Sequence, residues 1–353
     1  MKTIPITIRR MMLLSVTAFL LTVPTLRADT EDRIKKSFTV TGEGQLLLRA
    51  DRGSVEVGTT DGDKIEVEVI RTVKHAKAGK AADIFKNHEV TFSQRGNDIE
   101  IRADNQPKLK SMWNDLWRQF QVRYVINVPR KFNLDLKTAG GSITVADLTG
   151  KLRGETSGGN LRFGRVQGPV WGKSSGGSIE VVEAGGKLDA ETSGGSIRIT
   201  KASADARLKT SGGNIRVGES VSKLDARTSG GSIRIEKATA EVAAHTAGGD
   251  IEIESAAGAV DASTSGGSIT FRLSAQPKGD CRGETSGGNI NVYLADNLGF
   301  NLDAKTSGGR VVTDLPVTVQ GEHKSSSLHG KLNAGGPNLT LRTSGGSIHL
   351  KKL

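Results

Sequence analysis

The chain has 353 residues, of which 25% are charged and 35% hydrophobic, with 45 glycines and one cysteine. A single cysteine excludes an intramolecular disulfide, so packing and hydrogen bonding must stabilise the fold. The formal net charge of +11 is a moderate basic excess, which suits contact with anionic polymers or lipid head groups and equally suits ordinary solubility.

Residues 1–28 have the three parts of a secretory signal peptide. Basic residues at positions 2, 9 and 10 precede an apolar run over 11–23, and Ala28 is a small residue before Asp29. The run is shorter than the roughly 20 residues that a membrane-spanning helix needs. We therefore expect an exported protein without a transmembrane span, located in the periplasm, at the cell surface or outside the cell.

The segment 29–130 contains short alternating runs without a fixed period, which is typical of degenerate β coils. Two insertions, 77–87 and 111–120, interrupt these runs. The second insertion places Trp113, Trp117 and Phe120 at helical spacing on one face. We expect a small helix there, which either covers the end of the solenoid or docks a lipid or a partner protein.

A strict repeat follows in residues 131–353, which we predict to be a regular β-solenoid. Gly-Gly pairs begin at 140, 158, 176, 194, 212, 230, 248 and 266, and further pairs at 287, 308 and 345 have wider spacing. Short alternating runs flank each pair, as in 224–235. A period of 18 residues with alternation predicts an all-β parallel β-helix in which each coil stacks about 4.8 Å above the last.

Apolar columns recur at fixed distances from each Gly-Gly pair. The second and fourth residues after the pair form two of them, for example Ile197 with Ile199 and Ile233 with Ile235. We expect these columns to face inward, with a Thr column before each corner. A further small or apolar column (Leu148, Val166, Ala184, Ala202, Ala238, Ala256) leaves open whether each coil has two faces or three. The corner glycines indicate either positive φ or close approach of neighbouring backbones.

Several phrases in the chain resemble a known family. They are Arg52-Gly-Ser-Val-Glu-Val57, the bridge 128–141, the recurrent Thr-Ser-Gly-Gly-Ser-Ile coils and the ending 332–348. Together they are similar to the bacterial putative-adhesin β-strand-repeat family, over nearly all of the mature chain. The resemblance implies an exported single-chain β-helix of unknown function, and it supplies no catalytic residues.

The residues give little sign of catalytic or cofactor chemistry. The six histidines lack the spacing of a metal site, so we expect them to be scattered and solvated, and we predict no catalytic residue, metal or cofactor. Cys281 falls in an inward column, which favours a buried apolar role over a nucleophile. We therefore expect a protein that is not an enzyme.

One outward column is unusual. Arg198, Arg216 and Arg234 occupy successive coils and are bounded by Glu180 and Glu252. Like charges one strand spacing apart repel unless an anion bridges them, so this column is a candidate polyanion-binding strip. The alternative is a solvated charged surface that guards the sheet against aggregation.

The pattern as a whole favours an adhesin-like structural or binding protein of the cell envelope. Its partners would be anionic envelope glycans or lipid head groups, with no specific nucleic acid, and it would be a monomer. The alternatives are a self-assembling envelope scaffold and a polysaccharide-acting β-helix enzyme. We expect the C-terminal end to be nearly open, because 348–353 is a core-forming strand, with Lys351 and Lys352 or the excursion 320–337 blunting it.

Overall fold

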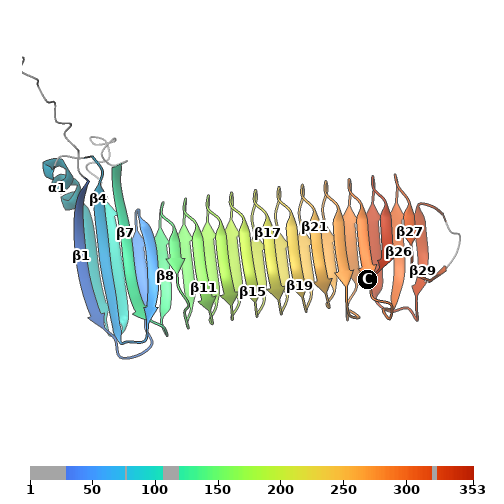
Figure 1. Ribbon diagram of the computed structural model, residues 1–353, viewed down its shortest axis with the longest axis horizontal. Helices are drawn as coiled ribbons and strands as arrows, with labels where there is room; N and C mark the ends of the chain where they lie inside the picture. The colour runs from blue at the N-terminus through green and yellow to red at the C-terminus, as the bar shows by residue number, and fades with distance from the viewer. Residues whose placement is uncertain (1–28, 76–77, 106–118, 320–323) are drawn as a thin grey trace, which may run out of the picture.

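The computed structural model describes residues 29–75, 78–105, 119–319 and 324–353, and the predicted signal peptide lies outside them. The described chain is a straight rod of two facing sheets (Figure 1). From the end that holds the N-terminal strands, sheet A consists of β1 (Thr30–Thr39), β4 (Lys64–Val73), β7 (Phe120–Pro129), β3 (Ser54–Thr60), β9 (Ile143–Val145), β11 (Leu161–Val166), β13 (Ile179–Ala184), β15 (Ile197–Ala202), β17 (Ile215–Ser220), β19 (Ile233–Ala238), β21 (Ile251–Ala256), β23 (Ile269–Leu273), β25 (Ile290–Leu294), β31 (Ile348–Lys352) and β27 (Val311–Thr313).

Sheet B runs alongside sheet A in the same direction. It consists of β5 (His88–Arg95), β6 (Asp98–Asn105), β2 (Gln45–Ala50), β8 (Asn133–Thr138), β10 (Leu152–Thr156), β12 (Val170–Ser174), β14 (Leu188–Thr192), β16 (Ala206–Lys209), β18 (Leu224–Arg227), β20 (Val242–His245), β22 (Val260–Ser263), β24 (Cys281–Thr285), β30 (Asn338–Thr343), β26 (Phe300–Thr306), β29 (Ser327–Leu332) and β28 (Val317–Val319). The chain is therefore an all-β solenoid, as predicted.

Each regular coil has two faces, because it contributes one strand to each sheet. The further small or apolar column does not form a third sheet. Its members end the strands of sheet A: in β13, for example, Val182 and Glu183 both point outward before Ala184 turns inward. The break in alternation bends the strand toward the second corner, which explains why only a small side chain fits at that position in most coils.

The predicted apolar columns form one continuous core. Ile197, Ile215 and Ile233 are each about 1% exposed, and they stack in register through β15, β17 and β19. This confirms the predicted inward face, since a register slip of one residue would have placed all three in solvent. The division of the chain at residues 130 and 131 remains a prediction, because both sheets continue across it.

A ladder of hydroxyl groups joins the Gly-Gly corners. From Thr156 onward, each Thr of the inward column, with Ser174 in one coil, donates a hydrogen bond of 2.7–2.9 Å to the carbonyl of the second glycine in the neighbouring coil. Most of these hydroxyls also accept from the amide of the second glycine in their own corner. The hydroxyls thus satisfy buried backbone groups at every corner.

The second glycine of each pair is required by close approach and not by positive φ. The corner glycines from 158 onward have no positive φ. A Cβ added to Gly213 would lie 2.1 Å from the carbonyl oxygen of Gly195, whereas the nearest atom to a Cβ on Gly212 would be 3.4 Å away. The first glycine of the pair therefore has room for a Cβ atom, whereas the second does not.

A second ladder uses the residue after each Gly-Gly pair. Its side-chain oxygen, from Ser, Asn or Asp, accepts a hydrogen bond from the backbone amide of the equivalent residue in the next coil. The last member is Arg310, whose amide donates to Ser347 Oγ at 3.2 Å. Because arginine has no acceptor, the ladder ends there, in the outermost coil of the stack.

At the N-terminal end the order of coils differs from the order of the chain. The coil of β2 and β3 lies between that of β6 and β7 and that of β8 and β9. Antiparallel strands then close the end: β1 and β4 extend sheet A beyond β7, and β5 extends sheet B beyond β6.

The helix of this end lies in the first insertion. It is α1 (Ala78–Asn87), which buries Ala81 and Ile84. Arg71, only 8% exposed, ties it to sheet A by donating to the carbonyls of Phe85 and His88 and by pairing with Asp32. A helix was expected in the second insertion, of which residues 111–118, with Trp113 and Trp117, lie outside the described part of the chain.

The expectation of an open C-terminal end is wrong. The last strand, β31, lies inside the stack between β25 and β27, and β30 lies between β24 and β26. The coil of β26 and β27 is outermost, and the excursion supplies β29, which pairs antiparallel with β26 and carries β28 at its far edge. Lys352 does not guard an edge, because its strand, β31, has a partner strand on each side. Its ammonium group forms an ion pair with Asp296.

The two glycines of one corner provide a stability test. We expect Gly213→Ala to lower the free energy of unfolding by several kcal/mol, since the added methyl group must displace the backbone of the neighbouring coil. Gly212→Ala should change it by about 1 kcal/mol or less, because its methyl group meets only ordinary contacts. Denaturant unfolding followed by circular dichroism measures both, and equal losses would contradict the assignment of close approach to the second glycine.

Candidate functional site

The three arginines of the predicted strip lie side by side on the outward face of sheet A. Arg198 in β15 is opposite Arg216 in β17, which is opposite Arg234 in β19. All three side chains are exposed, and each is held between two buried isoleucine or valine residues of its own strand. Their backbone positions are therefore fixed one strand spacing apart by the core beneath them.

The three guanidinium groups differ in their partners. Arg234 forms ion pairs with Glu252 and Glu254 of β21. Arg198 and Arg216 form no ion pair and no side-chain hydrogen bond with any residue that the structure describes. A shallow groove of about 330 Å³ runs past all three and is also lined by Ser196, Asn214, Ser232, Asp250 and Glu252, with the intervening isoleucines. At one end of the strip, therefore, two guanidinium groups form no ion pair among the described residues, although Glu180 of β13 stands opposite Arg198, and at the other end Arg234 is paired.

Several pairs in other outward columns compensate their charges, although Lys209 and Arg227 also stand opposite each other in sheet B. In sheet A, Glu183 faces Lys201 at 3.9 Å and Glu219 faces Lys237 at 3.0 Å. In sheet B, Lys137 lies 2.8 Å from Glu155. Hydrogen bonds from these lysines hold the pKa of Glu155 and of Glu219 below the usual glutamate value.

This alternation of sign is what stacked parallel strands require, since like charges directly opposite are destabilising. The self-neutralising surface that the sequence suggested thus exists, and it surrounds the strip. The run from Arg198 to Arg234 departs from the alternation.

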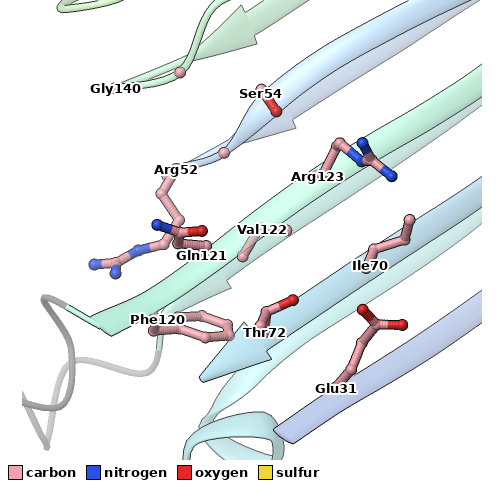
Figure 2. Close-up of a pocket in the computed structure, with 12 residues that line it drawn as sticks. Glu31, Arg52, Ser54, Ile70, Thr72, Phe120, Gln121, Val122, Arg123 and Gly140 are labelled. Atoms are coloured by element: carbon pink, nitrogen blue, oxygen red, sulfur yellow. The ribbon is translucent and has the colours of Figure 1, made fainter. Parts of the chain in front are cut away.

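A pocket of about 650 Å³ lies on sheet A near the N-terminal end (Figure 2). Strands β1, β4, β7 and β3 and the corner at Gly140 surround it, with Arg52 and Gln121 close together on one wall and Arg123 on another. Phe120 contributes to its lining, yet this ring is only 4% exposed and packs 6.3 Å from Phe85 of α1. A docking role for Trp113, Trp117 and Phe120 stays a prediction.

A buried polar cluster lies behind this pocket. The His88 ring packs edge-on against Phe120, and its Nε2 is 3.6 Å from Asp51 Oδ1. The expectation that the histidines are solvated is therefore wrong for His88, which is 1% exposed because α1 brings it inward at the start of β5. Burial raises the pKa of the neighbouring Tyr124 phenol far above its usual value. His88 and Tyr124 are thus closed to solvent, whereas the Asp51 side chain is partly exposed.

Cys281 has the environment that the column predicted. It is 1% exposed, and burial raises the pKa of its thiol to about 11. In the described ranges, no three side chains of His, Cys, Asp or Glu come together as a metal-binding group.

Sequence reasoning missed one feature of the outward surface. Trp171, the only tryptophan of the regular coils, faces outward in β12 and carries the Arg153 guanidinium over its ring, 3.6 Å from the centroid. The signal was present in the sequence, because Trp171 occupies a column that otherwise holds mainly charged residues.

Two long sheets of mostly parallel strands, joined by Gly-Gly corners, define this protein as a single-chain β-solenoid whose outward columns carry regular charge patterns. Its corners contain the Thr-Ser-Gly-Gly-Ser-Ile phrases on which the family resemblance partly rests. The chain belongs to the Toastrack DUF4097 family, which matches residues 45–351 and so confirms the resemblance.

The chain is also similar to solved structures of bacterial proteins at low sequence identity. A structure described as a "putative adhesin" from Bacteroides fragilis has 10% identity and a TM-score of 0.34, with 91% of this chain and 97% of that chain covered. One described as a "putative lipid binding protein" from Parabacteroides distasonis has 12% identity and a TM-score of 0.32, with the same coverage. At these scores the likeness carries no argument about function. No curated protein matches the chain.

The reactivity of Cys281 tests its burial. A pH of 8 lies below the raised pKa of the Cys281 thiol, so the thiol is protonated as well as inaccessible. We therefore expect modification by a thiol-reactive dye to be at least about 100-fold slower in the folded protein than in guanidinium chloride. In a Cys281→Ala background, Arg282→Cys places a thiol on the exposed side of the same strand and should react rapidly when folded. Rapid modification of the native protein would contradict the inward assignment.

Proposed function

We propose that this protein is an exported, non-enzymatic, adhesin-like binding protein of the cell envelope that holds anionic polymers along its arginine strip. The observation that carries the proposal is the stacking of Arg198, Arg216 and Arg234 in successive coils, with the first two lacking partners among the described residues. Anionic envelope glycans and lipid head groups share the required chemistry. We commit to the polymeric glycan, because the strip is linear.

The energetics of the strip favour an anionic ligand. Two guanidinium groups on neighbouring strands repel each other when no counter-charge is near, and solvent and salt only partly screen them. A carboxylate, sulfate or phosphate group placed between Arg198 and Arg216 would accept charge-assisted hydrogen bonds from both, and each guanidinium offers a planar fork of donors. Glu252 and Glu254, which compensate Arg234, would set the limit of the site.

The rigidity of the solenoid also supports a polymeric ligand. The three arginines come from three coils whose spacing is fixed by backbone hydrogen bonds, so their side chains follow the long axis of the rod. A chain with regularly spaced charges could bind along this axis with little reorganisation of the protein. When the protein loses little conformational entropy on binding, a given set of contacts gives a higher affinity.

Export and monomeric behaviour belong to the same proposal. The signal-like residues 1–28 support export. No helix in the described ranges is long and apolar enough to span a membrane. Antiparallel strands extend both sheets at the N-terminal end and sheet B at the C-terminal end, where sheet A ends on the three-residue β27, and this favours a single rod over a self-assembling filament. Because the acid–base cluster of His88 and Tyr124 is buried, we also propose that the protein is not an enzyme.

Heparin, a polyanion, tests the strip in the mature protein. We expect the double variant Arg198→Ser/Arg216→Ser to bind heparin about tenfold more weakly at low ionic strength and to lose much of the salt dependence of binding, since exposed charges are screened over about 8 Å at physiological salt. Affinity is measured by calorimetry at two salt concentrations.

The matched control is Lys201→Ser/Lys237→Ser. It also removes two cations from the outward face of sheet A, in β15 and β19, but each of these lysines is already paired with a glutamate of a neighbouring coil. We expect the control to retain most of its affinity. If both double variants weaken binding equally, net charge and not the strip accounts for it, and the proposal fails.

A further inference from the structure

A second groove, of about 510 Å³, lies on the opposite sheet, along the edge where β8, β10 and β12 begin. One side of it is the outward row of sheet B, in which Asp135, Arg153, Trp171 and Asp189 stand opposite one another in successive strands. The residues that precede the strands form its other side: Asn133, Lys151, Pro169 and Lys187. The groove therefore follows the long axis across four coils.

The indole of Trp171 is held in a defined position on this surface. Arg153, from the coil on one side, places its guanidinium over the ring. This guanidinium is itself held 3.4 Å from the Glu155 carboxylate and 3.9 Å from that of Asp135. The coil on the other side presents Asp189, a much shorter side chain, and both Trp171 and Asp189 line the groove. One face of the indole is thus covered by Arg153, and the partly exposed Trp171 side chain lines the groove together with Asp189.

Three charged side chains that form no ion pair within the described ranges line the same groove. The Asp189 carboxylate and the Lys151 and Lys187 ammonium groups form no ion pair with any residue in the described part of the chain, and the indole N–H donates no hydrogen bond there. Asp135 differs, because Arg49 binds both of its carboxylate oxygens, at 2.8 and 2.9 Å. Both donors and acceptors are therefore available beside the ring.

We propose that this groove binds a neutral, β-linked hexopyranose chain, with one sugar ring packed on the free face of Trp171. A pyranose with equatorial substituents presents C–H groups to a flat apolar surface and directs its hydroxyls outward from the ring edge. An indole supplies such a surface together with one hydrogen-bond donor. Asp189 accepts from sugar hydroxyls, and Lys151 and Lys187 donate to them.

The charges of the groove favour a neutral sugar over an anion or a cation. Cations and carboxylates both line the groove, with Lys151, Arg153 and Lys187 alongside Asp135 and Asp189, so it has no run of one sign. The arginine strip, in contrast, is on sheet A and has such a run. The two sites are on different sheets and select for different chemistry, so this inference does not depend on the proposed function.

Titration of the mature protein with cellohexaose and chitohexaose, both β-linked and neutral, tests the groove. Calorimetry gives the affinity, and tryptophan fluorescence reports on the ring. We expect at least one of the two oligosaccharides to bind, with affinity reduced at least about tenfold by Trp171→Ala and about fivefold by Asp189→Ala. Trp171→Phe, which keeps an aromatic face, should retain part of the affinity and should remove the fluorescence change.

Asp225→Ala is the matched control, because it removes a carboxylate from the same outward column two coils farther along, where Arg227 already pairs with it at 2.7 Å. It should bind as the parent does. Heparin binding should be unchanged in Trp171→Ala, which also shows that this variant is folded. Absence of binding by the parent to both oligosaccharides, or equal affinity of the parent and Trp171→Ala, would overturn the proposal.

Discussion

The solenoid depends on one hydrogen bond, repeated at each regular corner: the hydroxyl of an inward Thr donates to the carbonyl of the second glycine in the neighbouring coil, as Thr228 does to Gly213 at 2.8 Å. The bond forms only if the corners approach so closely that a Cβ on that glycine would overlap the next carbonyl. Thr and the second glycine are therefore a single unit. Because the regular corners use the same unit, the coils stack in register, apart from one shift between β21 and β23.

Exact stacking of equivalent residues has a consequence for the surface. Each outward side chain lies next to its equivalent in two neighbouring coils, so a column of one charge would repel itself along the rod. The chain meets this constraint by alternating sign, as in Glu183 with Lys201 and Glu219 with Lys237. A departure from the alternation is costly in the free protein. The arginine strip is such a departure, which makes it a candidate binding surface. The Trp171 column is another candidate for a different reason, because an uncharged aromatic side chain interrupts its charged residues.

The regular part of this fold could be predicted because its signals are local. The Ile columns and the inward Thr column follow from alternation and an 18-residue period, and the structure places both as expected. The order of coils at the ends could not be predicted, since the spacing of Gly-Gly pairs gives the length of each excursion and not the position to which the chain returns. One readable sign existed: Arg310 stands where the other corners have Ser, Asn or Asp, so no coil could continue the ladder beyond it. The burial of His88 had no such sign, because it depends on α1 and on Phe120, which is remote in sequence.

Both ends of the rod use the same topology. In each, a coil from a distant part of the chain lies between the outermost coil and the regular stack: β2 with β3 at one end, and β30 with β31 at the other. The outermost coil is followed by antiparallel strands, and the final strands at the C-terminal end, β27 and β28, have only three residues each. Short or charged edge strands are poor templates for further pairing. To fray, such an end must separate strands that are hydrogen-bonded on both sides. A rod closed in this way offers its long outward faces for interaction, and these faces carry both the arginine strip and the Trp171 groove.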